Sequence, residues 1–207
     1  AFGLAMTFQA RKTAREQERA ERVSEFLVGL FQVADPGQAR GSSVTAREVL
    51  DRGAKQLEKG LGMDPLTQAS LLETMGRVYL HLGLYQKSEE LVAQSTVLRE
   101  RVLGKDDPLT LKSRHLEILA IYPQGRNKEA EALSRTLLPD ARRILGEEHP
   151  GTLAVLNTLA VTVDNQARPA EALEIHRQVL EKRRRVLGPD DPESLWSLNN
   201  VGWGLFN

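Results

Sequence analysis

The side chains that most often carry out chemistry in proteins are sparse in this sequence. Its four histidines (His81, His115, His149 and His176) are scattered, and no two of them share a helix at the spacing that metal ligands need. His176 falls on the inner side of an expected helix, so we interpret it as a packed core histidine. The absence of cysteine excludes disulfides and thiolate catalysis and leaves the compartment open. We therefore expect no metal site.

Motifs for nucleotide and acyl-transfer chemistry are absent too. Neither the GxGxxG nor the GxxxxGK[ST] phosphate-binding loop occurs, and the sequence contains no kinase catalytic loop and no GxSxG elbow. The paired carboxylates Glu89-Glu90 and Glu147-Glu148 fall on expected surface positions, where solvated charge accounts for them. The sequence therefore predicts a chain that is not an enzyme and needs no cofactor.

The overall charge gives no reason to expect a nucleic-acid or membrane partner. Twenty-eight basic residues balance 28 acidic ones among 207 residues. We interpret the densest basic run, Lys182-Arg183-Arg184-Arg185, as a solvated helix end. Aromatic residues make up only 5% of the chain, and its apolar content is mostly Leu and Ala, which favours helix over strand.

The sequence segments that must position any functional residue are repeated along the chain. Three sets of small residues each keep a spacing of 42 residues: Gly62, Gly104, Gly146 and Gly188; Gly83, Gly125 and Ala167; Ser88, Ala130 and Ala172. A fixed period of this length is the signature of a solenoid.

Each period is predicted to contain a helix of about fifteen residues, a turn and a longer second helix. In residues 146–187 the apolar residues of the first helix recur at spacings of three and four: Leu153, Leu156, Leu159, Ala160 and Val163. The glycine after each Val-Leu or Ile-Leu pair is expected to end the second helix in the left-handed conformation. Asp107-Pro108 and Asp191-Pro192 are suited to start the next helix. Pro139 predicts a kink at residues 135–139.

A two-helix repeat with small residues where its helices cross resembles the tetratricopeptide repeat. These residues are Gly76, Ala160 and Gly202 on the first helix (helix A), and Ser88, Ala130 and Ala172 on the second (helix B). The 42-residue period and the phrase "LGPDDPESLWSLNNVG" resemble the longer, kinesin-light-chain-like subtype. The resemblance covers residues 62–207 and implies an all-α, right-handed superhelical solenoid of antiparallel helix pairs. The second copy departs from it, because Ile118 takes a small slot while Arg114 and Glu117 take apolar ones.

We divide the chain into three parts on this basis. Residues 1–33 are expected to form a juxtamembrane-like and capping helix. Residues 34–61 should be a loop and a degenerate half-repeat helix, with Thr45 and Glu48 in capping-box spacing. The repeats then follow at 62–103, 104–145, 146–187 and, in part, 188–207. The apolar opening "AFGLAMTFQ" is shorter than the roughly 20 residues of a membrane span, so we expect no direct span, although a severed membrane anchor stays open as an alternative.

The resemblance implies a non-catalytic scaffold that binds a protein or an extended peptide on the concave face, which the A helices line. The residues that helix A should present there are Glu73, Arg77, Lys112, His115, Tyr122, Asn157, Val161, Asp164, Trp196, Asn199 and Trp203. Asn157 and Asn199 occupy equivalent positions, and a ladder of amides can bind a peptide backbone. The alternative, that both are ordinary polar surface residues, stays open.

Two further roles are open. A short apolar tail, a charged helix containing "FLVGLFQVADPGQARG" and then repeats resemble bacterial membrane-anchored serine/threonine protein kinases that carry tetratricopeptide repeats. That resemblance implies a sensory or docking region whose catalytic domain lies N-terminal to this chain. Trp196 and Trp203 also suit a structural module that associates with itself end to end. The sequence leaves the compartment unknown: the cytoplasm is one option, and a kinase region would be attached to the bacterial membrane with the repeats on the extracytoplasmic side.

Overall fold

The computed structural model describes residues 23, 24, 26, 45–59 and 63–206, which form helices and contain no strand. They belong to two compact units, divided between Met75 and Gly76. The helix predicted within residues 1–33 and the loop before Thr45 lie outside the described residues, apart from Val23, Ser24 and Phe26, as does the marker Gly62. The described helices are α2 (Ala46–Glu58), α3 (Pro65–His81), α4 (Tyr85–Leu103), α5 (Pro108–Ile121), the 3-10 helix η1 (Tyr122–Gln124), α6 (Asn127–Leu145), α7 (Pro150–Asp164), α8 (Pro169–Leu187) and α9 (Pro192–Phe206).

The first unit holds α2 and the first part of α3. The predicted capping box is confirmed at the start of α2: the Thr45 N–H donates to Glu48 Oε2 at 2.9 Å, and the Glu48 N–H donates to Thr45 Oγ1 at 3.2 Å. Gln68 Nε2 donates to the Leu57 carbonyl at 2.7 Å, which ties α3 to α2. Leu57 and Leu72 are fully buried, so the apolar side of each helix is covered.

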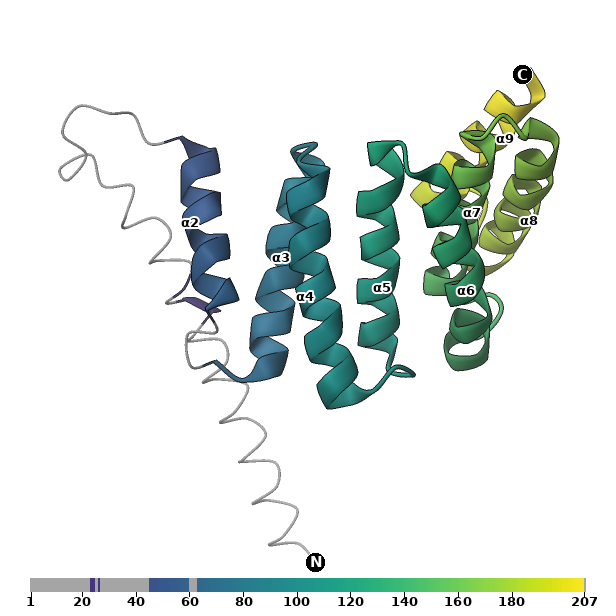
Figure 1. Ribbon diagram of the computed structural model, residues 1–207. Helices are drawn as coiled ribbons and strands as arrows, with labels where there is room; N and C mark the ends of the chain where they lie inside the picture. Colours follow the sequence, from purple (N-terminus) through teal and green to yellow (C-terminus); the bar gives the residue numbers. More distant parts are fainter. Residues whose placement is uncertain (1–22, 25, 27–44, 60–62, 207) are drawn as a thin grey trace, which may run out of the picture. The chain divides into compact units, whose positions relative to one another are not determined.

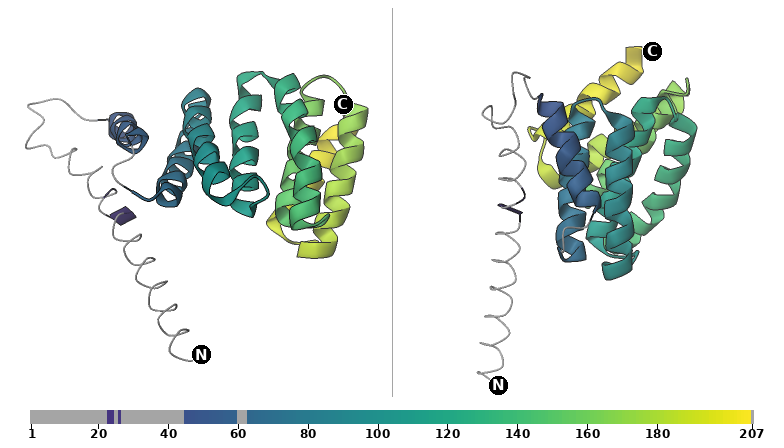
Figure 2. Two further views of the ribbon diagram at one scale, coloured as in Figure 1. Left: turned by 60° about the horizontal axis from the view of Figure 1, so that its bottom comes forward. Right: turned by 60° about the vertical axis from the view of Figure 1, so that its left-hand side comes forward.

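The second unit is a stack of helices in chain order, from the last residues of α3 to α9. Helices α4, α6 and α8 begin at positions 85, 127 and 169, while α5, α7 and α9 each begin at a proline, at 108, 150 and 192. Both sets keep the 42-residue period of the sequence. Each helix from α4 to α9 packs against the next, as Figure 1 and the two views of Figure 2 show. The predicted all-α solenoid of antiparallel helix pairs is confirmed.

The turns between repeats are capped as the sequence predicts. Asp107 Oδ1 accepts the Leu109 N–H at 2.8 Å, and Asp191 Oδ1 accepts the Glu193 N–H at 2.8 Å. His149 takes the same role with its ring, because Nδ1 accepts the Gly151 N–H at 3.0 Å. A proline follows each capping residue, where its missing N–H is not needed.

The glycines at the two kinds of turn adopt different conformations. Gly104, Gly146 and Gly188, which end the B helices, have φ of 89°, 106° and 96°, with ψ between 158° and 168°. Their φ is positive as predicted, but the high ψ places them in an extended region that only glycine adopts readily, not in the left-handed helical one. The left-handed conformation occurs instead in the turn between helices A and B, where Gly125 has φ 81° and ψ −2°. Ala167 takes the equivalent position with φ 58°.

At the crossing of helices A and B, a large side chain in one helix goes with a small residue in the other. A Cβ added to Gly76 would lie 2.4 Å from Val92 Cγ2. One and two repeats later, the equivalent pairs are Ile118 with Ser134 and Ala160 with His176, and all four of these residues are at most 5% exposed. Since Ser134 is small, the crossing can accommodate Ile118. The prediction that His176 is a core residue is confirmed.

Arg114 and Pro139, which depart from the usual helix pattern, do not interrupt the helices that contain them. Helix α5 runs in register from Pro108 to Ile121, and Arg114, which takes an apolar slot, forms an ion pair with Asp140 at 3.5 Å. Pro139 is exposed on α6, and the helix runs through it without interruption. The bend at residues 135–139 stays a prediction.

Candidate functional site

The A helices of the second unit are joined to one another by polar side chains. His115 Nε2 on α5 lies 2.9 Å from Thr158 Oγ1 on α7, and Asn200 Nδ2 on α9 donates to Asn157 Oδ1 on α7 at 3.1 Å. Both contacts join residues 43 positions apart, so they are the same contact in successive repeats. They place α5, α7 and α9 side by side. We call the surface that these helices share the A-helix face; its residues are Lys112, His115, Asn157, Val161, Asp164, Trp196, Asn199 and Trp203.

His115 serves this face as a structural contact. It is partly buried, and burial lowers the pKa of its imidazole to about 4. The ring is therefore neutral at pH 7 and offers no positive charge to an acidic ligand. Its neighbour Thr158 also donates to the Ala154 carbonyl at 3.0 Å, so the contact between α5 and α7 is anchored to the backbone.

The two candidate asparagines differ in their surroundings. Asn157 is partly buried, and its side-chain oxygen is engaged by Asn200. Asn199 is exposed. The sequence period correctly marks Asn157 and Asn199 as equivalent, but the residue that touches Asn157 is the one after Asn199, because neighbouring A helices are offset by one position.

The most exposed part of the A-helix face lies on α9. Trp196 is 62% exposed and Trp203 is 65% exposed, with Asn199 between them. These residues are three and four positions apart, so they lie along one side of the helix, with the two indoles about 10 Å apart along its axis. A row of two large aromatic side chains around one amide is thus open to solvent.

The remaining candidates are spread more widely. Lys112 is exposed, while Val161 and Asp164 are partly buried, and Arg77 is exposed on the last turns of α3. Tyr122 belongs to η1 and packs against the apolar core; burial, and to a lesser extent Tyr85, raises the pKa of its hydroxyl. Glu73 belongs to the first unit and is only 4% exposed. The structure therefore groups the candidates on α5, α7 and α9, and Glu73 is not among them.

Comparison with known proteins identifies the repeat. The sequence profile of the tetratricopeptide repeat matches residues 68–109, 122–151 and 152–193, which is more than half of the chain. The chain belongs to the tetratricopeptide repeat family. The gap in the match, residues 110–121, covers most of α5, the helix in which Arg114, Glu117 and Ile118 depart from the usual pattern.

Solved structures share the fold at low sequence identity. The Q17M form of the TPR-like repeats of a putative kinesin light chain from Podosopora anserina has a TM-score of 0.63 and 22% identity, over 89% of this chain and 85% of that one. BtubC (BKLC) from P. vanneervenii has a TM-score of 0.66 and 18% identity, over 96% of this chain and 78% of that one. No curated protein matches the sequence. At these identities the similarity establishes the fold.

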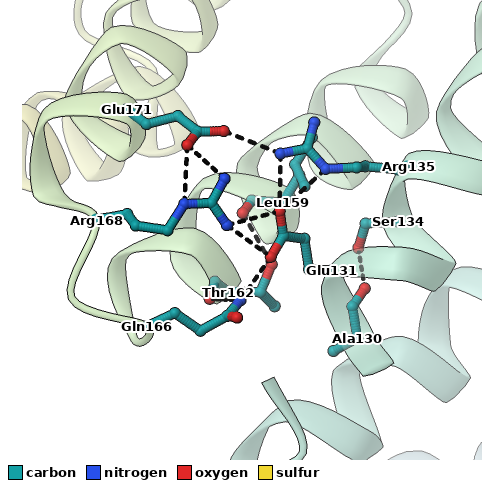
Figure 3. Close-up of polar contacts among 9 residues, drawn as sticks. All are labelled: Ala130, Glu131, Ser134, Arg135, Leu159, Thr162, Gln166, Arg168 and Glu171. Atoms are coloured by element: carbon teal, nitrogen blue, oxygen red, sulfur yellow. Dashed lines mark hydrogen bonds and ion pairs between the residues drawn. The ribbon is translucent and has the colours of Figure 1, made fainter. Parts of the chain in front are cut away.

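Successive tetratricopeptide repeats are also linked by a charge network that sequence reasoning missed. Glu131 on α6 accepts hydrogen bonds from Arg135 and Gln166 at 2.7 Å and from Arg168 at 2.9 Å, and Glu171 binds both arginines (Figure 3). Burial alone would raise the pKa of Glu131, but these three donors lower it. The network recurs one repeat earlier, where Glu89 accepts from Gln124 at 2.8 Å and from Arg126 at 2.7 Å.

The carboxylate pairs singled out in the sequence are therefore engaged with basic residues. Glu90 pairs with Lys87 at 3.1 Å, Glu147 pairs with Arg142 and Lys182, and Glu148 pairs with Arg185. The 42-residue spacing of Glu89 and Glu131, and of Arg126 and Arg168, was the signal that could have revealed the network.

The interpretation of the basic run as wholly solvated was wrong for Arg183. This residue is 5% exposed, and its Nη1 donates to Ser197 Oγ at 2.8 Å and to the Glu193 carbonyl at 3.2 Å. Arg99 makes the equivalent bond to Ser113 Oγ at 2.6 Å, two repeats earlier. One repeat after Arg99 and Ser113, the equivalent positions hold Ala141 and Val155, both buried, so the repeat junction there is apolar. The buried arginines act as inter-repeat clamps and are not available to a ligand.

The part of the chain that the structure describes holds no group of three or more His, Asp or Glu residues that could bind a metal ion. Among the same residues, every helix is too short or too polar to cross a membrane.

Proposed function

We propose that this tetratricopeptide chain binds an extended peptide segment of a partner protein on the A-helix face. The observation that carries the proposal is the solvent-exposed row of Trp196, Asn199 and Trp203, next to Asn157 on the neighbouring helix. The family consists typically of non-catalytic scaffolds, and a protein-interaction role is consistent with the fold.

The chemistry of this row suits a peptide main chain. Each indole offers a flat apolar surface to the side chains of a ligand, and its N–H provides one donor. Asn200 donates to the side-chain oxygen of Asn157, so the side-chain NH2 group of Asn157 can donate to a peptide carbonyl. Asn199 can both donate and accept. Together they would bind the backbone, while the indoles would contact the side chains.

The charges on the face favour a ligand without a strong net charge. Lys112 and Asp164 carry opposite charges, and the His115 ring is neutral at pH 7. The basic side chains of Arg126, Arg135 and Arg168 are held in ion pairs between repeats. We therefore expect apolar and backbone contacts, rather than ion pairs, to dominate binding.

The experiment selects peptides from a random displayed library against the full chain and then measures their affinities. Trp196 and Trp203 are the only tryptophans in the chain, so intrinsic fluorescence reports on the site directly. We expect the double variant Asn157→Ala, Asn199→Ala to weaken binding at least tenfold. The matched control is Asn127→Ala, Asn165→Ala, which removes two asparagines from the turns at the ends of the helices, where Asn165 donates to Asn127 at 3.1 Å. Equal affinities of the two double variants would refute the proposal.

The alternative role as the docking region of a bacterial membrane-anchored serine/threonine kinase depends on residues 1–33 and on sequence outside this chain, and it stays a prediction. The gene sequence upstream of Ala1 tests it, since that role requires a spanning segment and a kinase domain there.

A further inference from the structure

His115 occupies the same position of the repeat as the two asparagines of the proposed site. His115, Asn157 and Asn199 follow one another at intervals of 42 residues, on α5, α7 and α9. The His115 ring contacts Thr158 on the next A helix, and Asn157 contacts Asn200 in the same way. We call His115, Asn157 and Asn199 the polar ladder. Its first member is an imidazole, and the other two are amides.

The contact with Thr158 determines which ring nitrogen of His115 carries the proton. The Thr158 hydroxyl has one hydrogen, and it donates that hydrogen to the Ala154 carbonyl at 3.0 Å. Towards His115 Nε2, which lies 2.9 Å away, the hydroxyl oxygen can therefore only accept. It follows that Nε2 donates and carries the ring proton.

The other ring nitrogen, Nδ1, is then an acceptor. Burial lowers the pKa of His115 to about 4, so at pH 7 the ring is neutral and has a single N–H. Since that N–H is on Nε2, Nδ1 has a lone pair and no hydrogen. In the part of the chain that the structure describes, the buried polar atoms without a hydrogen bond include Nδ1 of His176 but not Nδ1 of His115. The His115 ring makes its hydrogen bond through Nε2, so Nδ1 is accessible to a ligand.

Two neighbouring members of the polar ladder thus offer opposite hydrogen-bonding groups. His115 Nδ1 can only accept, whereas Asn157 uses its side-chain oxygen for Asn200 and keeps its NH2 group as a donor. A peptide main chain has one N–H and one C=O at every residue except proline, which has no N–H. The two ladder groups therefore match one N–H and one C=O of such a chain.

We propose that His115 Nδ1 accepts a main-chain N–H from the bound peptide, so that the residue of the peptide over α5 cannot be proline. This inference rests on the proposed peptide binding and adds the class of ligand: an extended segment with a free N–H over α5 and a carbonyl over α7. A proline or an N-methylated residue at that position would place a carbon atom against Nδ1 where a hydrogen is needed.

The first test needs no ligand. Long-range proton–nitrogen NMR spectra of the full chain show which nitrogen of each histidine ring carries the proton. The His115→Gln variant identifies the signal of His115, because the chain has four histidines. We expect the proton on Nε2 at pH 7. A proton on Nδ1 would overturn the proposal, because that nitrogen could not accept a hydrogen bond.

The second test uses a synthetic form of the tightest peptide selected from the displayed library. Replacing its amides by esters, one at a time, removes a single N–H with little change in shape. We expect one of these esters to weaken binding about fivefold to the wild type but less than about twofold to His115→Phe, whose ring has no acceptor. The control is Asn157→Ala, which should keep the fivefold loss. The same peptide with an N-methyl group at that position should bind the wild type about tenfold more weakly, or worse.

Two further measurements separate the hydrogen bond from a purely structural role of His115. His115→Gln should bind the amide peptide within about twofold of the wild type, because one side-chain amide can donate to Thr158 and accept the N–H. In the wild type, the amide peptide should shift the Nδ1 resonance of His115 and the ester should not, a result that requires no variant to fold.

The outcomes also distinguish this proposal from peptide binding itself. If binding were lost in Asn157→Ala, Asn199→Ala but no ester distinguished the wild type from His115→Phe, the role of His115 would be refuted and peptide binding would stand. If the library yielded no peptide that binds the A-helix face, both proposals would fail.

Discussion

Replacing Ala167 with glycine should stabilise the protein, although the change removes a methyl group. Ala167 has φ 58° in the turn between α7 and α8, where the equivalent residues Gly83 and Gly125 have φ 73° and 81°. A residue with a Cβ is strained in this conformation by about 1–2 kcal/mol. Glycine relieves the strain but loses about 0.4–1 kcal/mol through the greater freedom of the unfolded chain. The net gain should be about 0.5–1 kcal/mol.

The reverse substitution tests the same reasoning at the preceding turn. A Cβ at Gly125 would meet no atom within 4 Å, so Gly125→Ala introduces backbone strain without a clash. We expect it to lower the free energy of unfolding by about 0.5–1 kcal/mol.

Urea unfolding followed by circular dichroism would measure both changes. The control is Ala132→Gly, the same chemical change at an exposed position inside α6, which should destabilise by about 0.5–1 kcal/mol. If Ala167→Gly lowered the unfolding midpoint as the control does, the assignment of strain to Ala167 would be wrong.

Two further predictions concern His115 and Arg183. His115 has a folded-state pKa of about 4 against about 6.5 when unfolded, so the unfolded chain binds the proton more readily. The contribution of the neutral His115 ring to stability is complete above pH 6.5 and is lost as the pH falls towards 4, by up to about 3 kcal/mol. The unfolding free energies at pH 7 and pH 4.5 should therefore differ less in His115→Gln than in the wild type. Arg183→Ala should destabilise the contact between α8 and α9 by about 2 kcal/mol or more, because Ser197 and the Glu193 carbonyl lose a buried donor. Hydrogen exchange in α9 should then accelerate, whereas exchange equal to that of the variant of its exposed neighbour, Arg184→Ala, would contradict the buried clamp.

The period of the sequence predicts which residues are equivalent in successive repeats better than it predicts which residues touch each other. The 42-residue spacing was enough to place α4, α6 and α8 and to identify the capping roles of Asp107 and Asp191, since those depend on residues close in sequence. It also marked Asn157 and Asn199 as equivalent. It did not reveal that Asn157 contacts Asn200, because that pairing depends on how neighbouring helices are offset in space.

The run of basic residues led to a wrong prediction for Arg183, because burial decides the role of that residue. Arg183 lies in a run of four basic residues, and only its position on the inner side of α8 distinguishes it from Arg184. The equivalence with Arg99, which bonds to Ser113 as Arg183 does to Ser197, is visible in the sequence once the helices are aligned. The exposure of Leu195, Leu198 and Leu205 on α9 is visible only in the structure, because their spacing in the sequence is that of a buried stripe.

Because large and small residues are matched at the helix crossings, a single helix of one copy cannot be exchanged freely for that of another copy. Pairing the first helix of the second copy with the second helix of the first would set Ile118 against Val92, where the native partners are Ser134 and Gly76. The volume of each copy is thus balanced internally. A chimera assembled from whole copies should therefore fold more readily than one spliced between its helices.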